Sequence, residues 1–134
     1  MTPVRILVAV LAVVAGFVAR PAQAQDYPNR PILLIVPFPS GGGNDTLARI
    51  VATKLGAALG QPVVVDNRGG ANGIIAAQMV AKSPPDGYNL LLFTSPIWLL
   101  PLLQDNVPYD PVRDFAPIAV TDSSPSVLVV HPSL

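Results

Sequence analysis

The chain has 134 residues, with eight basic residues, eight acidic residues, one histidine and no cysteine or glutamate. The absence of cysteine excludes disulfides, thiolate metal sites and a cysteine nucleophile. No charge run or basic stripe occurs, which argues against nucleic acid as a partner because binding to phosphates needs a concentrated basic face.

Residues 1–24 have the three-part pattern of an export signal. Arg5 supplies positive charge, Ile6–Val18 is an unbroken apolar run, and Ala22–Ala24 presents small residues at the positions that a signal peptidase reads. We therefore expect cleavage after Ala24.

The alternative for this segment is a membrane anchor. A spanning helix needs about 20 apolar residues, and this run ends earlier, at Arg20. We expect no membrane insertion once the signal is cleaved. The mature part, residues 25–134, then keeps six basic and eight acidic residues and a net charge of about −2.

The first predicted strand, Ile32–Val36, is apolar on both faces, as expected of a strand covered on both sides. A loop rich in proline and glycine follows it. Asn44 or Asp45 has N-cap chemistry, and apolar residues recur at helical spacing from there to Leu59. Gly60 ends this predicted helix.

The same order of strand, loop and helix is repeated further along the chain. We predict a strand at Val63–Val65, a helix from near Asn72 to about Lys82 and, after a Pro-Pro-Asp-Gly turn, a strand at Asn89–Thr94. A short helical segment capped by Thr94 or Ser95 comes next and is interrupted by Pro101, and two more strands are predicted at Phe115–Val120 and Ser126–Val130.

This alternation predicts an α/β fold, with an open, largely parallel sheet and helices on both faces. Residues 25–134 form one lobe in this interpretation. The chain stops directly after an apolar, strand-like run, so we expect the lobe to be incomplete at its C-terminus.

Ligands of such sheets bind beyond the carboxyl ends of the strands, where loops lead into helix N-termini. Glycine lets backbone N–H groups approach a ligand closely, and each helix N-terminus carries about half a positive charge. Three loops therefore predict an anion receptor that needs no cationic side chain. The candidate ligand-binding residues are Phe38, Ser40, Gly41, Gly42, Gly43, Asp45, Asn67, Gly70, Ala71, Thr94 and Ser95.

Simpler roles compete for several of these residues. The glycines could serve tight turns alone, and no phosphate-binding glycine motif follows the first strand. Asp45 could cap its helix or meet a ligand amine or a bridging water. Arg68 could pair with a ligand carboxylate or stay solvated, and Trp98 could line the cleft or pack between layers.

Catalysis is not expected. His131 is the only histidine, and no arrangement of nucleophile, base and orienting acid can be assembled around it. The aspartates lack the ligand spacing of a calcium loop, so we predict no metal and no cofactor. An exported hydrolase using Ser40 or Ser95 remains the alternative class, and it would need a base that this chain does not offer.

Several stretches resemble the Bug family of tripartite tricarboxylate transporter substrate-binding proteins. They are Tyr27-Pro28-x-x-Pro31, Ile35 to Asp45 with Ala48-Arg49, Gly60 to Gly73, Ala81-Lys82-x-Pro84-Pro85-Asp86-Gly87-Tyr88, Pro108 to Pro111 with Asp114 to Pro117, and Val129 to Pro132. The resemblance covers nearly the whole mature chain in register.

The resemblance implies a periplasmic, two-lobed receptor that closes on a small organic carboxylate and delivers it to the membrane permease subunits of a transporter. It places the family's binding loops on Phe38–Asp45, Asn67–Gly73 and Thr94-Ser95. Pro96–Pro101 is bulkier than the segment usual there, which leaves open a ligand with an apolar portion. A non-functional remnant of an interrupted gene is a further reading of this chain.

Overall fold

Three parallel strands form the framework of the fold. The computed structural model describes residues 26–123, 127, 129–131 and 133, so the expected export signal lies outside the described residues. The strands are β1 (Ile32–Val36), β2 (Val63–Asn67) and β3 (Asn89–Leu91), in the order β2-β1-β3. Both neighbours run parallel to the central strand β1, as the sequence predicts.

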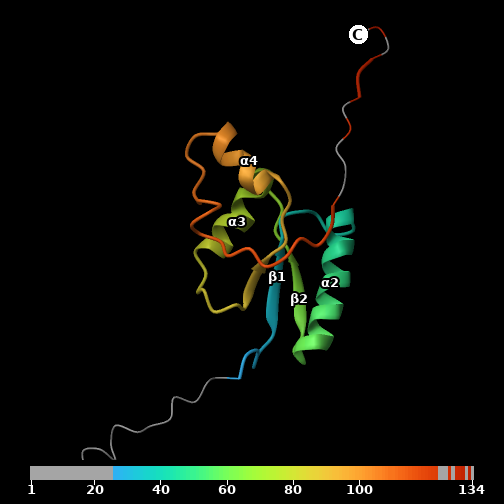
Figure 1. Ribbon diagram of the computed structural model, residues 1–134, viewed down its shortest axis with the longest axis vertical. Helices are drawn as coiled ribbons and strands as arrows, with labels where there is room; N and C mark the ends of the chain where they lie inside the picture. Colours follow the sequence, from blue (N-terminus) through green and yellow to red (C-terminus); the bar gives the residue numbers. More distant parts are fainter. Residues whose placement is uncertain (1–25, 124–126, 128, 132, 134) are drawn as a thin grey trace, which may run out of the picture.

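Helices cover both faces of this sheet. They are α2 (Gly43–Leu59), the short 3-10 helix η1 (Ala71–Gly73), α3 (Ile74–Ala81) and α4 (Pro96–Leu103). Figure 1 shows α2 on one side of the strands and α3 and α4 on the other. The predicted α/β architecture is therefore confirmed.

Each helical layer has its own hydrophobic core. Alternate side chains of a strand point to opposite faces, so Leu90 and Leu92 pack toward α2 whereas Leu91 and Phe93 pack toward α3 and α4. The α2 core contains Leu34, Val36, Ala48, Ala52 and Leu92, and the core on the other face contains Ala77, Ile97 and Tyr109.

Helix α2 begins earlier than its sequence predicts. Its N-cap is Gly42, with an extended backbone and no side-chain cap, so the prediction of a cap at Asn44 or Asp45 is wrong. The glycines allow the chain to enter the helix without a side-chain cap. The C-terminus is as predicted, because Gly60 adopts a left-handed conformation with φ of 69° and its N–H bonds the carbonyl of Gly56 at 3.0 Å.

Pro101 does not interrupt α4, contrary to prediction. A proline inside a helix leaves the carbonyl four residues earlier without its usual N–H donor. Here that carbonyl belongs to Ile97, and the hydroxyl of Tyr109 donates to it at 3.3 Å. Burial raises the pKa of Tyr109, which keeps this hydroxyl protonated. A residue distant in sequence thus replaces the bond that proline removes.

The three later strand predictions differ from the structure: one strand is shorter than predicted, and two are not formed by the described residues. The strand predicted at Asn89–Thr94 ends at Leu91, which pairs with Ile35 near the end of β1, and the amide of Leu92 makes a last bond to the Ile35 carbonyl at 3.0 Å. The strand predicted at Phe115–Val120 is absent: Ile118 is 79% exposed and Val120 is 89% exposed. The described residues of the predicted strand at Ser126–Val130 are in no strand either, and residues 124–126 and 128 lie outside the described residues.

The segment before β1 is fastened to the turn before β3. The hydroxyl of Tyr27 donates to the carbonyl of Gly87 at 2.8 Å, and the Tyr27 ring stacks edge-on against Tyr88. Arg30 forms an ion pair with Asp86 at 2.9 Å and covers the face of the Tyr88 ring. This cluster lies at the N-terminal end of the sheet, away from the glycine-rich loops. Of the described helices, none has the length and apolarity needed to cross a membrane.

Candidate functional site

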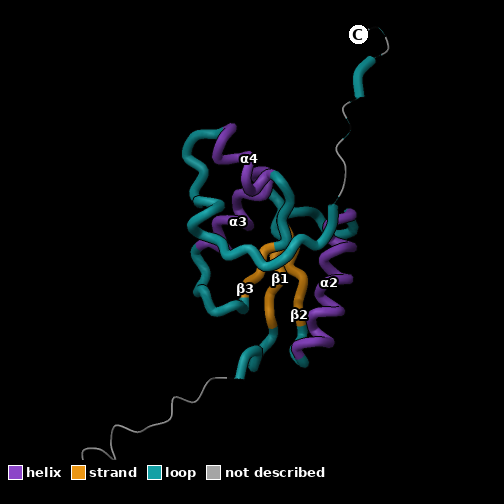
Figure 2. Tube along the Cα trace, in the orientation of Figure 1, coloured by secondary structure: helices purple, strands orange, loops and turns teal. Residues whose placement is uncertain are grey.

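Three loops follow the carboxyl ends of the three strands and meet at one end of the sheet (Figure 2). We call them loop 1 (residues 37–42), loop 2 (residues 68–73) and loop 3 (residues 92–95). Because all three strands are parallel and adjacent, their loops come together as predicted.

Loop 1 leads into an uncapped helix N-terminus. Gly41 has φ of 86°, a conformation that side-chain-bearing residues rarely adopt, and it turns the chain into α2. The first amides of α2, on Gly43 and Asn44, have no partner within the helix, and no side chain caps it. Their N–H groups, together with the helix dipole, favour an anion at this point.

Asp45 lies in the first turn of α2 and is 4% exposed. Its Oδ2 accepts hydrogen bonds from the amide of Gly41 at 2.8 Å and from Nε of Arg49 at 3.0 Å. These bonds, that of Arg49 foremost, lower the pKa of Asp45 from 3.8 to about 2. The carboxylate is therefore ionised at neutral pH, and from its buried position it holds loop 1 through the amide of Gly41.

Asn67 joins loop 1 to the end of β2. Its Nδ2 donates to the carbonyl of Phe38 at 3.1 Å, and its side chain also contributes to lowering the pKa of Asp45. The Oδ1 atom of Asp45 is buried without a hydrogen-bond partner. Both carboxylate oxygens thus face the protein, and direct contact of Asp45 or Asn67 with a ligand stays a prediction.

Loop 2 has an unusual backbone. Gly70 and Gly73 have φ of 120° and 91°, and between them Ala71 and Asn72 also have positive φ, of 46° and 53°. For residues other than glycine such conformations cost about 1–3 kcal/mol each and are concentrated at functional sites. The helix predicted to start near Asn72 begins at Ile74, with Gly73 as its N-cap, directly after η1.

Loop 3 differs from loop 1 because its helix amides are already bonded. The amides of Ile97 and Trp98 donate to the carbonyls of Thr94 and Ser95, each at 3.1 Å. Ser95 is the N-cap of α4, yet its side chain makes no capping bond. The backbone carbonyls of Thr94 and Ser95 are therefore engaged by α4, and a role of these two residues in binding stays a prediction. Trp98 in the first turn of α4 is 48% exposed, so it is not part of the core.

Phe93 in loop 3 touches both other loops, and sequence reasoning missed it. Its ring forms an edge-on pair with Phe38, with centroids 6.1 Å apart. It also fills the space where a side chain at Gly73 would lie. Its position in the sequence could have identified it. Phe93 directly precedes the predicted binding residue Thr94, and at two residues from Leu91 it is expected on the same face of the sheet.

Two other residues considered from the sequence have local partners. Arg68 is the first residue of loop 2 and pairs with Asp66 of β2 at 2.9 Å, with much of its side chain in solvent. His131 is exposed, and its Nδ1 contacts Oγ of Ser133 at 2.7 Å. The described contacts of His131 include neither Ser40 nor Ser95. Within residues 26–123 and the described tail positions, no group of His, Asp, Cys or Glu could hold a metal.

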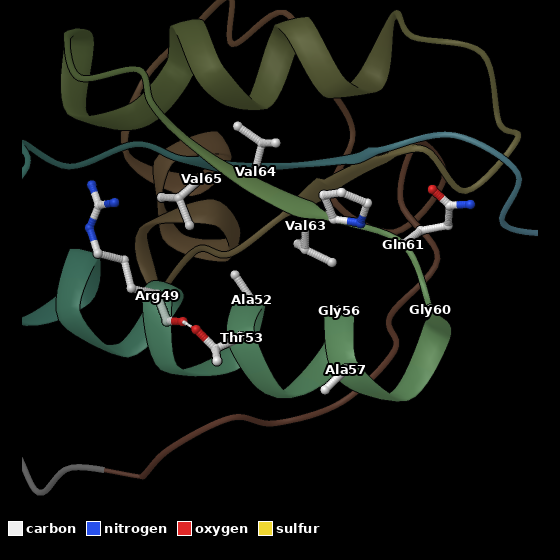
Figure 3. A pocket seen from close by; sticks show the side chains of 11 residues that line it. Arg49, Ala52, Thr53, Gly56, Ala57, Gly60, Gln61, Val63, Val64 and Val65 are labelled. Carbon is white, nitrogen blue, oxygen red and sulfur yellow. Dashed lines mark hydrogen bonds between the residues drawn. The ribbon is translucent and has the colours of Figure 1, made fainter.

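An open groove of about 820 Å³ lies between α2 and β2, away from the ends of the loops. Figure 3 shows Val63 and Val65 directed toward α2, with Arg49 at one end of the groove. Most of its other lining groups are small or apolar, and Thr53 bonds the carbonyl of Arg49 at 2.8 Å. The groove lacks the converging amides of the loops, so we place the candidate site at the loops.

Comparison with known proteins points to one family. The family profile described as the tripartite tricarboxylate transporter family receptor (TctC) matches residues 47–134. Protein BugT of Bordetella pertussis is 43% identical over 136 residues, which span 100% of this chain and 41% of BugT.

Solved structures agree. The periplasmic binding protein BugD is 43% identical with a TM-score of 0.66, over 69% of this chain and 31% of BugD. R. palustris Rpa4515, solved with adipate, is 45% identical with a TM-score of 0.61, over 64% of this chain and 29% of that one. The chain thus spans less than half the length of these relatives.

The pKa of Asp45 predicts a defined dependence of stability on pH. A carboxylate with a pKa lowered from 3.8 to about 2 stabilises the folded state above pH 4, and this contribution is lost as the pH falls through 2. D45N should therefore unfold at a lower urea concentration than the wild type at pH 7, and the difference should shrink between about pH 4 and pH 2.

Arg49→Gln provides the matched test of the cause. It removes the largest contribution to the lowered pKa, so the acid-induced loss of stability should begin at a higher pH than in the wild type. A difference between D45N and wild type that stays constant from pH 5 to pH 2 would show that the charge of Asp45 is not what stabilises loop 1.

Proposed function

The chain belongs to the tripartite tricarboxylate transporter receptor family, and from this premise we propose that it is the first lobe of a periplasmic receptor for a small organic carboxylate. The receptor delivers its solute to the membrane permease subunits of a transporter. The family and the structural neighbours are solute-binding proteins. The observation that carries the proposal is the uncapped N-terminus of α2, at Gly43 and Asn44, beside loop 2.

Backbone amides, rather than cationic side chains, hold the carboxylate in this proposal. The amides of Gly43 and Asn44 have no partner in the helix and point where the helix dipole is positive. The nearby negative charge of Asp45 is offset by its ion pair with Arg49. The pair reduces the repulsion that an incoming anion would meet. The adipate bound to Rpa4515 supports a solute of this class.

One lobe supplies only part of the binding energy. A helix N-terminus contributes about 0.3–1 kcal/mol, and up to about 2 kcal/mol in a buried geometry. Micromolar affinity requires about 8 kcal/mol. The remainder must come from enclosure of the solute between two lobes that exclude water. We therefore propose that residues 25–134 form one lobe of a longer, two-lobed protein.

The two-lobed proposal predicts a difference in affinity. A polypeptide extended by the second lobe should bind at least one of succinate, adipate or citrate with a Kd of about 1 μM. Residues 25–134 alone should bind the same solute at least about tenfold more weakly. Isothermal calorimetry on both polypeptides measures this, and equal affinities would contradict the role of the second lobe.

Gly43→Pro tests the amide of Gly43 in that extended polypeptide. Gly43 is the first residue of α2, where proline is favoured and no intrahelical N–H is lost, and the extended backbone of Gly42 suits a residue before proline. The protein should stay folded. Hydrogen bonds to charged groups are worth about 1.5–3 kcal/mol, so affinity for the carboxylate should fall about tenfold or more.

Gly43→Ala is the matched control because it adds a side chain and keeps the N–H group. No atom lies within 4 Å of the position its Cβ would take. Its thermal midpoint should match that of G43P, while its affinity should stay near that of the wild type. If both variants lose affinity equally, the amide of Gly43 is not a ligand contact.

Residues 1–24 direct export in this proposal. In a Gram-negative host the protein recovered from the periplasm should begin at Gln25, as checked by N-terminal sequencing. Ala24→Tyr places a large side chain where the peptidase requires a small one, so the uncut precursor should accumulate at the membrane. Recovery of unprocessed wild-type chain from the cytoplasm would contradict a periplasmic location.

A further inference from the structure

Phe93 occupies the space between the two glycine-rich loops. We propose that it is a positioning residue, whose ring sets the separation of loop 1 and loop 2 at the solute site. This inference rests on the proposed function for the meaning of the site, but the contacts of Phe93 stand on the geometry alone. Phe93 itself need not touch the solute.

The contact with loop 2 leaves no room for a side chain. A Cβ atom at Gly73 would lie 2.3 Å from Cζ of Phe93 and 2.8 Å from its Cε2. Only the hydrogens of a glycine fit against this edge of the ring. Gly73 is also the N-cap of α3, so the ring fixes the point at which loop 2 becomes helix.

The contact with loop 1 is made through Phe38. The two rings are 6.1 Å apart at their centroids and inclined by 69°, a favoured edge-to-face arrangement. The carbonyl of Phe38 is separately held by Nδ2 of Asn67. Phe38 is therefore fixed at its backbone by β2 and at its ring by Phe93, which leaves loop 1 little freedom to move.

The ring of Phe93 thus acts as a spacer, since loop 1 packs on it through Phe38 and loop 2 touches the Cζ edge. Binding groups must be held within about 0.5 Å of their productive positions to be effective. Leucine lacks the Cε and Cζ atoms that touch Gly73, so Phe93→Leu should let the loops approach each other. Phe93→Tyr should push loop 2 away, because the added hydroxyl points at Gly73.

Phe93 also packs against the core beneath α3 and α4, so a loss of stability alone would not reveal positioning. Phe115→Leu is the matched control. Phe115 packs against the same core and forms the same kind of edge-on pair, with Tyr109 at 5.8 Å. Both leucine variants should lower the urea midpoint, but only F93L should alter the loops.

The decisive readout is NMR on the chain itself. In the wild type, the ring current of Phe93 should displace the α-proton resonances of Gly73, and F93L should abolish this displacement. Amides of residues 41–43 and 70–73 should shift in F93L and F93Y, and those protected in the wild type should exchange about tenfold faster in F93L. F115L should leave these resonances in place. F93Y keeps the aromatic core packing and so tests the idea even if F93L does not fold.

Titration of the polypeptide extended by the second lobe with succinate or adipate completes the test. Wild-type and F115L amides in loops 1 and 2 should respond to the same solute concentrations, whereas F93L should require about tenfold more. Identical loop spectra and titrations for F93L and F115L would overturn the proposal. An extended wild-type polypeptide in which Phe93 sets the loops, but whose loop amides do not respond to any carboxylate, would contradict the receptor function instead.

Discussion

Parallel pairing of β1 with both of its neighbours is the constraint on which the rest of the structure depends. Because β2 and β3 flank β1 in the same direction, the ends of all three strands lie at one edge of the sheet. The helices return on opposite faces and bury the strands between two separate cores. Three loops that are distant in sequence are thereby brought to one place, and the opposite edge is left for the cluster around Tyr27 and Tyr88.

At the end of the sheet that carries the three loops, the backbone provides most of the positive charge. The helix α2 presents unpaired amides at its start, while the nearby carboxylate of Asp45 is turned inward and paired with Arg49. An ionised group in this position would oppose an anion if it were directed outward. Buried, it instead holds the Gly41 amide and so shapes the loop whose following amides remain available. Loop 1 can therefore be held in place by the negative charge of Asp45 and still attract an anionic ligand through its backbone amides.

Several departures from local rules are compensated by residues far along the chain. Proline 101 lies within α4 because Tyr109 donates to the carbonyl that lost its partner. The strained loop 2 ends at Gly73, where the ring of Phe93 packs. The strand-like sequence Phe115–Val120, in contrast, pairs with no strand among the described residues and does not become a strand. In each case the presence or absence of a tertiary partner decides the local structure.

The sequence by itself determined the family, the order of the elements and the three loops, because hydrophobic periodicity, turn residues and motifs are local properties of the chain. It placed β1 and the end of α2 correctly, since an apolar run bounded by proline and a glycine after a helix act within a few residues. Tertiary structure alone decided the inward direction of Asp45, the continuation of α4 through Pro101 and the place of Phe93 between the loops. These features depend on contacts between segments that only packing brings together, and no periodicity in the chain encodes them.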